Sequence, residues 1–244
     1  MAAPETASPP QSNETPVLGD ALRLVRVPFS PGAVFRELQD RPRFWVPYAI
    51  ASVAAAVLGV LMIPFNRRVT EAILERLNRP VPPASPLDTV KAIAGAPIIL
   101  LIVCAVSGGI LYLVASSLGG ETTYKKMLSV VIHAWPLFFA QQLLAYIVLS
   151  MRGLDAIHGP MDMIVSLGAD LALPSDAQVG YFLRFFLGGI GPLQIWQLVI
   201  SAVGVGIMAR AGKGAAWTAA TVNYLFWLLL LSGLGAFGMK MAGG

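Results

Sequence analysis

Two residues of one apolar stretch have the types and spacing of a hydrolytic pair. Ser129 and His133 are four residues apart, so on a helix they share one face, as a serine nucleophile and its histidine base must. The chain has no Gly-x-Ser-x-Gly elbow and no oxyanion-hole candidate beside Ser129, and Pro136 one turn later indicates a kink. We therefore expect a protein that is not an enzyme.

Metal, cofactor and phosphate chemistry lack the residues that they need. The sequence holds two histidines, His133 and His158, and one cysteine, Cys104, without a His-Glu-x-x-His motif. The glycine-rich run 188–191 is not followed by Lys-Ser or Lys-Thr, which indicates a hinge and not a phosphate loop. We expect no metal site and no cofactor.

Besides His133, the strongly polar side chains inside the apolar stretches are amides, namely Gln141, Gln142, Gln194, Gln197 and Asn223. Ion-coupled transporters usually need buried charges, and these stretches contain no Asp, Glu, Lys or Arg. At about 1.5 Å per residue from the nearest flanking charges, His133 lies at roughly 10 Å and Asn223 at roughly 15 Å, with Gln141 and Gln197 both near 20 Å. We infer two interhelical hydrogen-bonded pairs, His133 with Asn223 and Gln141 with Gln197, which join helices.

These side chains must be positioned by helices that cross a membrane. Five stretches of at least 23 residues contain no charged residue, whereas about 20 apolar residues span the hydrocarbon layer. The stretches are apolar on all sides, unlike the amphipathic core helices of a soluble protein. We expect an all-α integral membrane protein with a bundle of five transmembrane helices. The expected spans are 44–64, 94–117, 127–150, 192–210 and 215–238.

Composition supports the same class. Mean hydropathy is +0.71 and 12% of residues are charged, against roughly 25% in soluble domains. The net charge is +4, but the basic residues flank the apolar stretches and do not form one basic face, so nucleic acid is not an expected partner.

The segments outside the spans have their own patterns. Residues 1–18 are rich in Pro, Ser and Thr and lack a signal-peptide pattern, so we expect a disordered tail. Residues 19–43 form an amphipathic surface segment, in which Ser30 and Pro31 begin a helix with Phe35 and Leu38 on its apolar face. Surface helices are also expected over 68–78 and from Ser175 in the long loops. The membrane domain then covers 44–239.

Basic residues indicate the orientation. With a cytoplasmic N-terminus, nine lie inside and eight outside. The short connections, which weigh most in the positive-inside rule, carry Lys125, Lys126, Arg210 and Lys213 on the N-terminal side. We expect the N-terminus inside and the C-terminus outside. Arginine outnumbers lysine 12 to 5 amid abundant alanine and glycine, which is typical of a GC-rich bacterial genome and favours a bacterial cytoplasmic membrane.

The order of several short motifs resembles the Yip family, multi-spanning membrane proteins named for interacting with Ypt and Rab GTPases. The motifs are Ser30-Pro31 with Phe35 and Leu38, Trp45 to Pro47, Gly119-Gly120 with Thr123-Tyr124, Ala134-Trp135-Pro136, and Ile195-Trp196 before Gly204 and Gly206. The resemblance covers about Ala21 to Gly238. It implies five transmembrane helices with a cytoplasmic N-terminus. The chain lacks the Asp-Leu-Tyr-Gly-Pro motif of eukaryotic members, so the prokaryotic branch is the more similar one.

Together these observations predict a membrane-embedded adaptor or organiser. The docking candidates are Phe35, Arg36, Leu38 and Arg43, whose helix would otherwise lie on anionic lipid. The expected partners are membrane lipids, a protein at the cytoplasmic face, and a second copy of the chain in a homo-oligomer. The alternative is a small permease or lipid-handling protein with a path between the third, fourth and fifth spans, lined by His133, Gln141 and Asn223.

Overall fold

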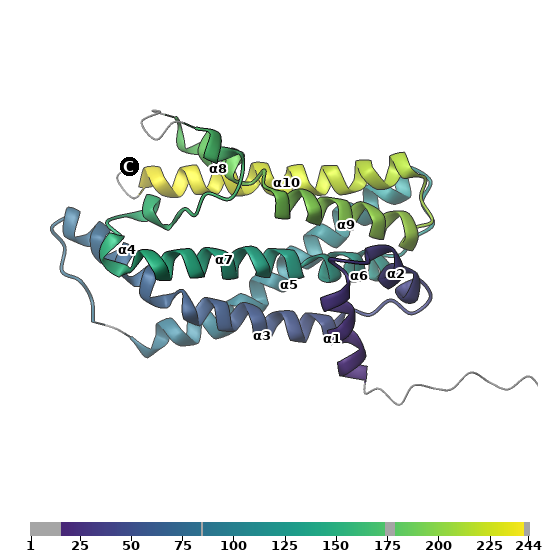
Figure 1. Ribbon diagram of the computed structural model, residues 1–244, viewed down its shortest axis with the longest axis horizontal. Helices are drawn as coiled ribbons and strands as arrows, with labels where there is room; N and C mark the ends of the chain where they lie inside the picture. The colour runs from purple at the N-terminus through teal and green to yellow at the C-terminus, as the bar shows by residue number, and fades with distance from the viewer. Residues whose placement is uncertain (1–15, 84, 174–178, 242–244) are drawn as a thin grey trace, which may run out of the picture.

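The computed structural model describes residues 16–83, 85–173 and 179–241, and every regular element assigned within them is helical. Long helices lie side by side along one axis (Figure 1). Three units are long and apolar enough to cross a membrane, and two bent helix pairs bring the number to five when each pair counts as one span. The three units are α5 (Pro86–Ser117), α6 (Tyr124–Ala134) with α7 (Pro136–Arg152), and α10 (Lys213–Met241).

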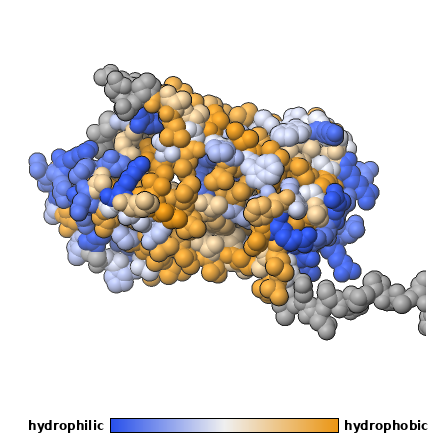
Figure 2. All heavy atoms as spheres, in the orientation of Figure 1, coloured by the Kyte–Doolittle hydropathy of each residue, from blue (hydrophilic) through white to orange (hydrophobic). Residues whose placement is uncertain are grey.

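The surface has the distribution of a membrane protein. On the face shown in Figure 2, hydrophobic residues cover the middle of the molecule and hydrophilic residues gather at its two ends. Large apolar side chains are exposed on the long helices, such as Ile99 of α5 at 62% and Leu234 of α10 at 58%. Such surface is unfavourable in water and is matched by hydrocarbon. The chain is an all-α integral membrane protein, as the sequence predicted.

The first bent pair joins α3 (Trp45–Leu61) and α4 (Ile63–Arg76) at an angle of 44°. Pro64 lies in the first turn of α4 and has no N–H for the carbonyl of Val60, so the α3 hydrogen-bond ladder ends there. The surface helix expected over 68–78 is therefore not a separate element, because α4 begins at Ile63 directly after α3 and ends at Arg76.

Prolines also shape the second and third spans. The third span breaks at Trp135, between α6 and α7, because Pro136 cannot donate to the carbonyl of Ile132. This is the kink that the sequence predicted. In α5, Pro97 lies inside the helix, and the hydroxyl of Tyr48 donates to its carbonyl at 2.8 Å, which joins α3 to α5.

The long loop after α7 folds back along the bundle. It contains short 3₁₀ turns, η1 (Leu154–Ala156), η2 (Pro160–Met163) and η3 (Ala169–Ala172). The second bent pair follows, α8 (Tyr181–Gly188) and α9 (Pro192–Met208), with an angle of 59°. The helix start predicted at Ser175 lies outside the described residues.

Two short helices precede the first span. They are α1 (Pro16–Arg26) and α2 (Pro31–Leu38). Helix α1 begins inside the segment 1–18 expected to be a disordered tail, whose first fifteen residues lie outside the described part of the chain. Both helices lie at one end of the bundle (Figure 1), which we call the N-terminal end, whereas α10 runs to the opposite, far end. The main core contains buried residues of α2, α3, α5, α6, α9 and α10.

Candidate functional site

Helix α2 packs into the N-terminal end of the bundle. Its apolar face carries Phe35, at 0% exposure, and Leu38, at 1%. Phe35 fits against α9 where Gly204 has no side chain, since a Cβ there would lie 2.9 Å from Cε2 and Cζ of the ring. Gln39 Nε2, just after α2, donates to the Ile207 carbonyl of α9 at 3.1 Å. The helix is therefore part of the main hydrophobic core, although it lies outside the spans.

This packing corrects the predicted docking surface. Phe35 and Leu38 are not available to a partner or to lipid, because they contact the chain's own bundle. The helical spacing of these apolar residues could not show whether they face a protein partner, lipid or the chain's own bundle. Each of the three would require the same apolar face. Arg36 is exposed on the opposite side of α2. Arg43 is half-buried and bound to Asp20 at 3.2 Å.

A cluster of charged residues fixes α1 against α2 and the start of α3. The Asp20 side chain is fully buried, and its two oxygens pair with Arg23 at 2.9 Å and Arg43 at 3.2 Å. Glu37 of α2 pairs with Arg23 at 3.2 Å and with Arg26 at 3.3 Å. Sequence reasoning missed Asp20. The available signal was an acidic residue on an amphipathic helix three positions before an arginine.

His133 lies beneath α2. It is 0% exposed, and the edge of its ring meets Phe35 with centroids 6.4 Å apart. Nδ1 donates to the Ser129 carbonyl at 2.7 Å. Nε2 of His133 and Oγ of Ser129 have no hydrogen-bond partner among the described residues. The two side chains therefore do not form a hydrolytic dyad, which would require a bond between serine hydroxyl and imidazole.

The two predicted interhelical pairs are wrong. Within residues 16–83, 85–173 and 179–241, neither His133 with Asn223 nor Gln141 with Gln197 forms a hydrogen bond, and Oδ1 of Asn223 is without a partner. Equal depth does not fix which way a side chain points around its helix, so matching depths did not produce contacts.

Several interhelical hydrogen bonds in the bundle come from aromatic side chains instead. Trp227 Nε1 of α10 donates to Ser107 Oγ of α5 at 2.7 Å. Tyr124 donates to the Ala105 carbonyl at 2.9 Å, and Tyr224 to the Gly189 carbonyl at 2.7 Å. A ring carries its polar atom far from its own backbone and can reach a neighbouring helix at the usual axial distance of about 8–10 Å.

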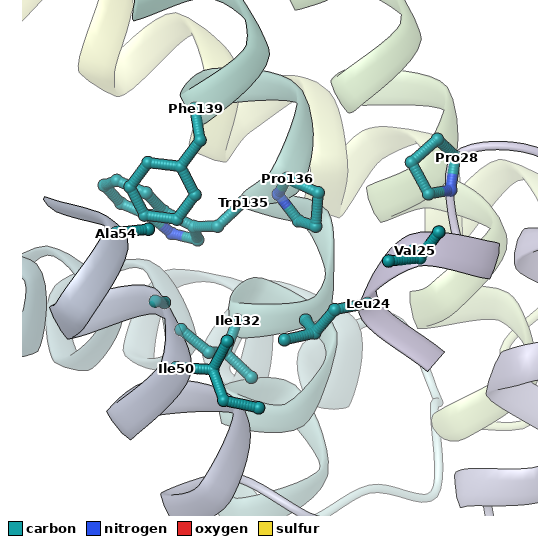
Figure 3. Close-up of a pocket in the computed structure, with 10 residues that line it drawn as sticks. Leu24, Val25, Pro28, Ile50, Ala54, Ile132, Trp135, Pro136 and Phe139 are labelled. Carbon is teal, nitrogen blue, oxygen red and sulfur yellow. The ribbon is translucent and has the colours of Figure 1, made fainter. Parts of the chain in front are cut away.

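An apolar crevice lies between α1, α3 and the α6–α7 break (Figure 3). Its volume is about 250 Å³. Leu24 and Val25 lie on one side of it, facing Ile50 of α3 and the Trp135-Pro136 break (Figure 3). None of His133, Gln141, Gln197 and Asn223 lines it. In the described part of the chain, no three His, Cys, Asp or Glu side chains form a group that could hold a metal ion.

The N-terminal end carries a surplus of exposed positive charge. The segments of this end contact one another, since Arg210 lies 4.0 Å from Glu121 and a Cβ at Gly120 would touch Ala209. The exposed basic residues are Arg26, Arg36, Arg41, Lys125, Arg210 and Lys213, and the exposed acidic ones are Glu37, Asp40 and Glu121. This arrangement can attract acidic protein surface or anionic lipid.

Comparison with known proteins gives a family. The Yip1 domain matches residues 25–237. The chain is also similar to "Membrane protein YknW" of Bacillus subtilis (strain 168), with 27% identity over 213 residues, 84% of this chain and 85% of that protein. No solved structure matched the chain. The chain belongs to the Yip1 domain family of membrane proteins.

Proposed function

We propose that the protein is a non-enzymatic adaptor or organiser, embedded in a bacterial cytoplasmic membrane, whose N-terminal end faces the cytoplasm and binds a partner with an acidic surface. The observation that carries the proposal is the locked position of α2. Because Phe35 is buried against Gly204 and Asp20 joins α1 to the start of α3, the exposed Arg36 and Arg41 have a fixed backbone beneath them. A preorganised charged surface loses less entropy on binding than a mobile one.

The position of the Phe35 ring against His133 favours an adaptor and not a permease. A polar path from the N-terminal end to His133 would have to pass Phe35, which contacts the imidazole and is fully buried. The crevice of Figure 3 is lined by apolar side chains and does not include His133.

The proposal is tested by co-purification from native membranes after crosslinking. The variant Arg36→Glu/Arg41→Glu reverses two exposed charges at the N-terminal end, and Arg79→Glu makes the same change at an exposed residue after α4. The adaptor predicts a defined protein partner that the double variant loses and the Arg79 variant keeps. Recovery of lipid alone, with no protein partner in either preparation, contradicts it.

Orientation has its own test, because the single cysteine, Cys104, is buried. A membrane-impermeant maleimide applied to intact cells should label Asp155→Cys, in the loop at the far end, and leave Asp40→Cys unlabelled. The reverse pattern would place the N-terminal end outside.

A lipid-handling role is the second candidate, and the apolar crevice favours it. Its lining by α1, α3 and the α6–α7 break would suit an acyl chain. Filling it with Ala54→Phe should then release a lipid that mass spectrometry detects with the wild-type protein. If the bound lipids of the two proteins are the same, the crevice is only a packing defect.

A further inference from the structure

The break between α8 and α9 packs against α10, and we infer its depth in the membrane from its position along that helix. Tyr224 of α10 donates to the Gly189 carbonyl at the break, and Tyr224 is about 16 Å along α10 from Lys213. The hydrocarbon layer is about 30 Å thick. The ring of Phe185 in α8 lies 3.0 Å from where a Cβ of Gly235 in α10 would stand. Non-helical backbone at this depth is tolerated only where it is buried in protein or lines a water-filled cavity.

A buried carboxylate faces this break. Asp170 of η3 is 6% exposed. Its Oδ1 accepts from the Gly168 amide at 3.1 Å, whereas Oδ2 has no hydrogen-bond partner among the described residues. Oδ2 lies 3.5 Å from the position that a Cβ of Gly188 would take. Across the described salt bridges, no lysine or arginine pairs with Asp170.

Several oxygen acceptors lie close to Gly168, whose amide binds Asp170. Gly168 lies at the centre, because a Cβ on it would be 2.7 Å from the Gly188 carbonyl oxygen and 2.9 Å from that of Ile190. The Gly188 carbonyl faces the end of its helix, and Pro192, four residues later, has no N–H to donate to it. Gln194 Oε1 is also buried without a partner, beside Gly191, which contacts Gly168.

We propose that Asp170 and the α8–α9 break bind a monovalent metal cation, with Na⁺ as the test ion. Asp170 Oδ2 supplies the charge, and Gly188 O and Gln194 Oε1 are the neutral oxygens of the same cluster. A cation at the C-terminal end of α8 is favoured by the helix dipole, and half-helix ends with unwound carbonyls suit such ions. One carboxylate neutralises one charge, whereas Ca²⁺ sites usually collect several. This site is independent of the proposed adaptor surface at the N-terminal end.

The full-length protein in detergent provides the test, with Cys104 as the reporter. Cys104 is the single cysteine and is 0% exposed, so a fluorogenic maleimide labels it only on unfolding. We titrate NaCl against choline chloride at constant ionic strength and pH. The midpoint of thermal unfolding of the wild-type protein should rise with the logarithm of the Na⁺ concentration once the site is filled, by about 5 °C at the highest concentration. Asp170→Asn should abolish the rise, and Asp155→Asn, which removes an exposed charge from the same loop, should keep it.

Three results would overturn the proposal. The first is the same unfolding midpoint in Na⁺ and in choline for the wild type, and the second is a Na⁺ response in Asp170→Asn as large as that of the wild type. The third is a midpoint that changes with pH but not with Na⁺, which would indicate that the carboxyl is protonated. If Asp170→Asn does not fold, binding of radioactive Na⁺ to the wild-type protein decides, with a saturable site at one ion per chain as the expected result.

Discussion

The Phe35 ring of α2 occupies the space in which a side chain at Gly204 of α9 would stand, with two ring carbons 2.9 Å from the ideal Cβ position. Because of this contact, α2, whose amphipathic sequence is typical of a surface helix, is part of the core. The contact buries Phe35 completely and brings its ring against His133. Small residues on membrane helices usually let two spans approach each other, and here one admits a side chain from a helix outside the spans.

Gly204→Ala should displace α2 and destabilise the protein. The new methyl would also lie 2.8 Å from Val130 Cγ1, and overpacking of this kind costs about 1–3 kcal/mol. Gly206→Ala is the matched control, because its Cβ would meet Ala216 at an ordinary 3.5 Å and the helix gains about 0.5–1 kcal/mol. Cys104 labelling during heating should show a lower midpoint for Gly204→Ala and a slightly higher one for Gly206→Ala. Equal midpoints would show that α2 is not held in this notch.

Asp20→Asn should loosen the N-terminal end of the bundle. The substitution removes the buried partner of Arg23 and Arg43, and we expect a loss of about 2 kcal/mol because both arginines are partly exposed. Asp40→Asn is the control, since Asp40 is exposed. Faster trypsin cleavage after Arg26 in Asp20→Asn, with unchanged cleavage in Asp40→Asn, would confirm the role. Unchanged cleavage in both variants would mean that apolar packing alone holds α1.

The sequence was sufficient for the class of the protein and for the position of the Pro136 break, because length, hydropathy and a missing N–H are local properties. It was not sufficient for the docking site. The burial of Phe35 depends on Gly204, 169 residues later in the chain, and no pattern around Phe35 contains that information. The two predicted hydrogen-bonded pairs were wrong for a related reason. The rotation of each helix about its axis decides which side chains meet, and depth in the membrane does not.

Trp227 and Ser107 should stabilise the bundle as a pair. Their 2.7 Å bond joins α10 to α5, and Ser107 is 3% exposed. A double-mutant cycle with Trp227→Phe and Ser107→Ala should give a coupling energy of about 0.6–1.7 kcal/mol, the range for hydrogen bonds between membrane helices. Chemical unfolding in mixed micelles measures it. The same cycle on Asn223→Ala and His133→Ala, which form no bond with each other, should give a coupling energy near zero.

Asp170 shows another limit of the sequence. Hydropathy placed it in a loop, and the absence of charges from the five apolar stretches argued against a buried carboxylate at membrane depth. The loop that carries Asp170 packs beside α8 because Gly168 has no side chain, so the carbonyl oxygens at the α8–α9 break can lie close to it. A glycine two residues before an aspartate is too common to have indicated this.

Gly168→Ala should therefore separate η3 from the α8–α9 break. Its Cβ would lie 2.7, 2.8 and 2.9 Å from the carbonyl oxygens of Gly188, Leu187 and Ile190. Backbone atoms cannot move aside as a side chain can, and the Ala169 amide, which donates to the Ile190 carbonyl at 2.9 Å, would lose its place. We expect a loss of about 2 kcal/mol or more in stability, read from the Cys104 midpoint. Gly180→Ala, whose Cβ would meet no atom of the described residues within 4 Å, should leave the midpoint unchanged. If Gly168→Ala behaves like Gly180→Ala, the loop does not rest against the break, and Asp170 is not held beside Gly188.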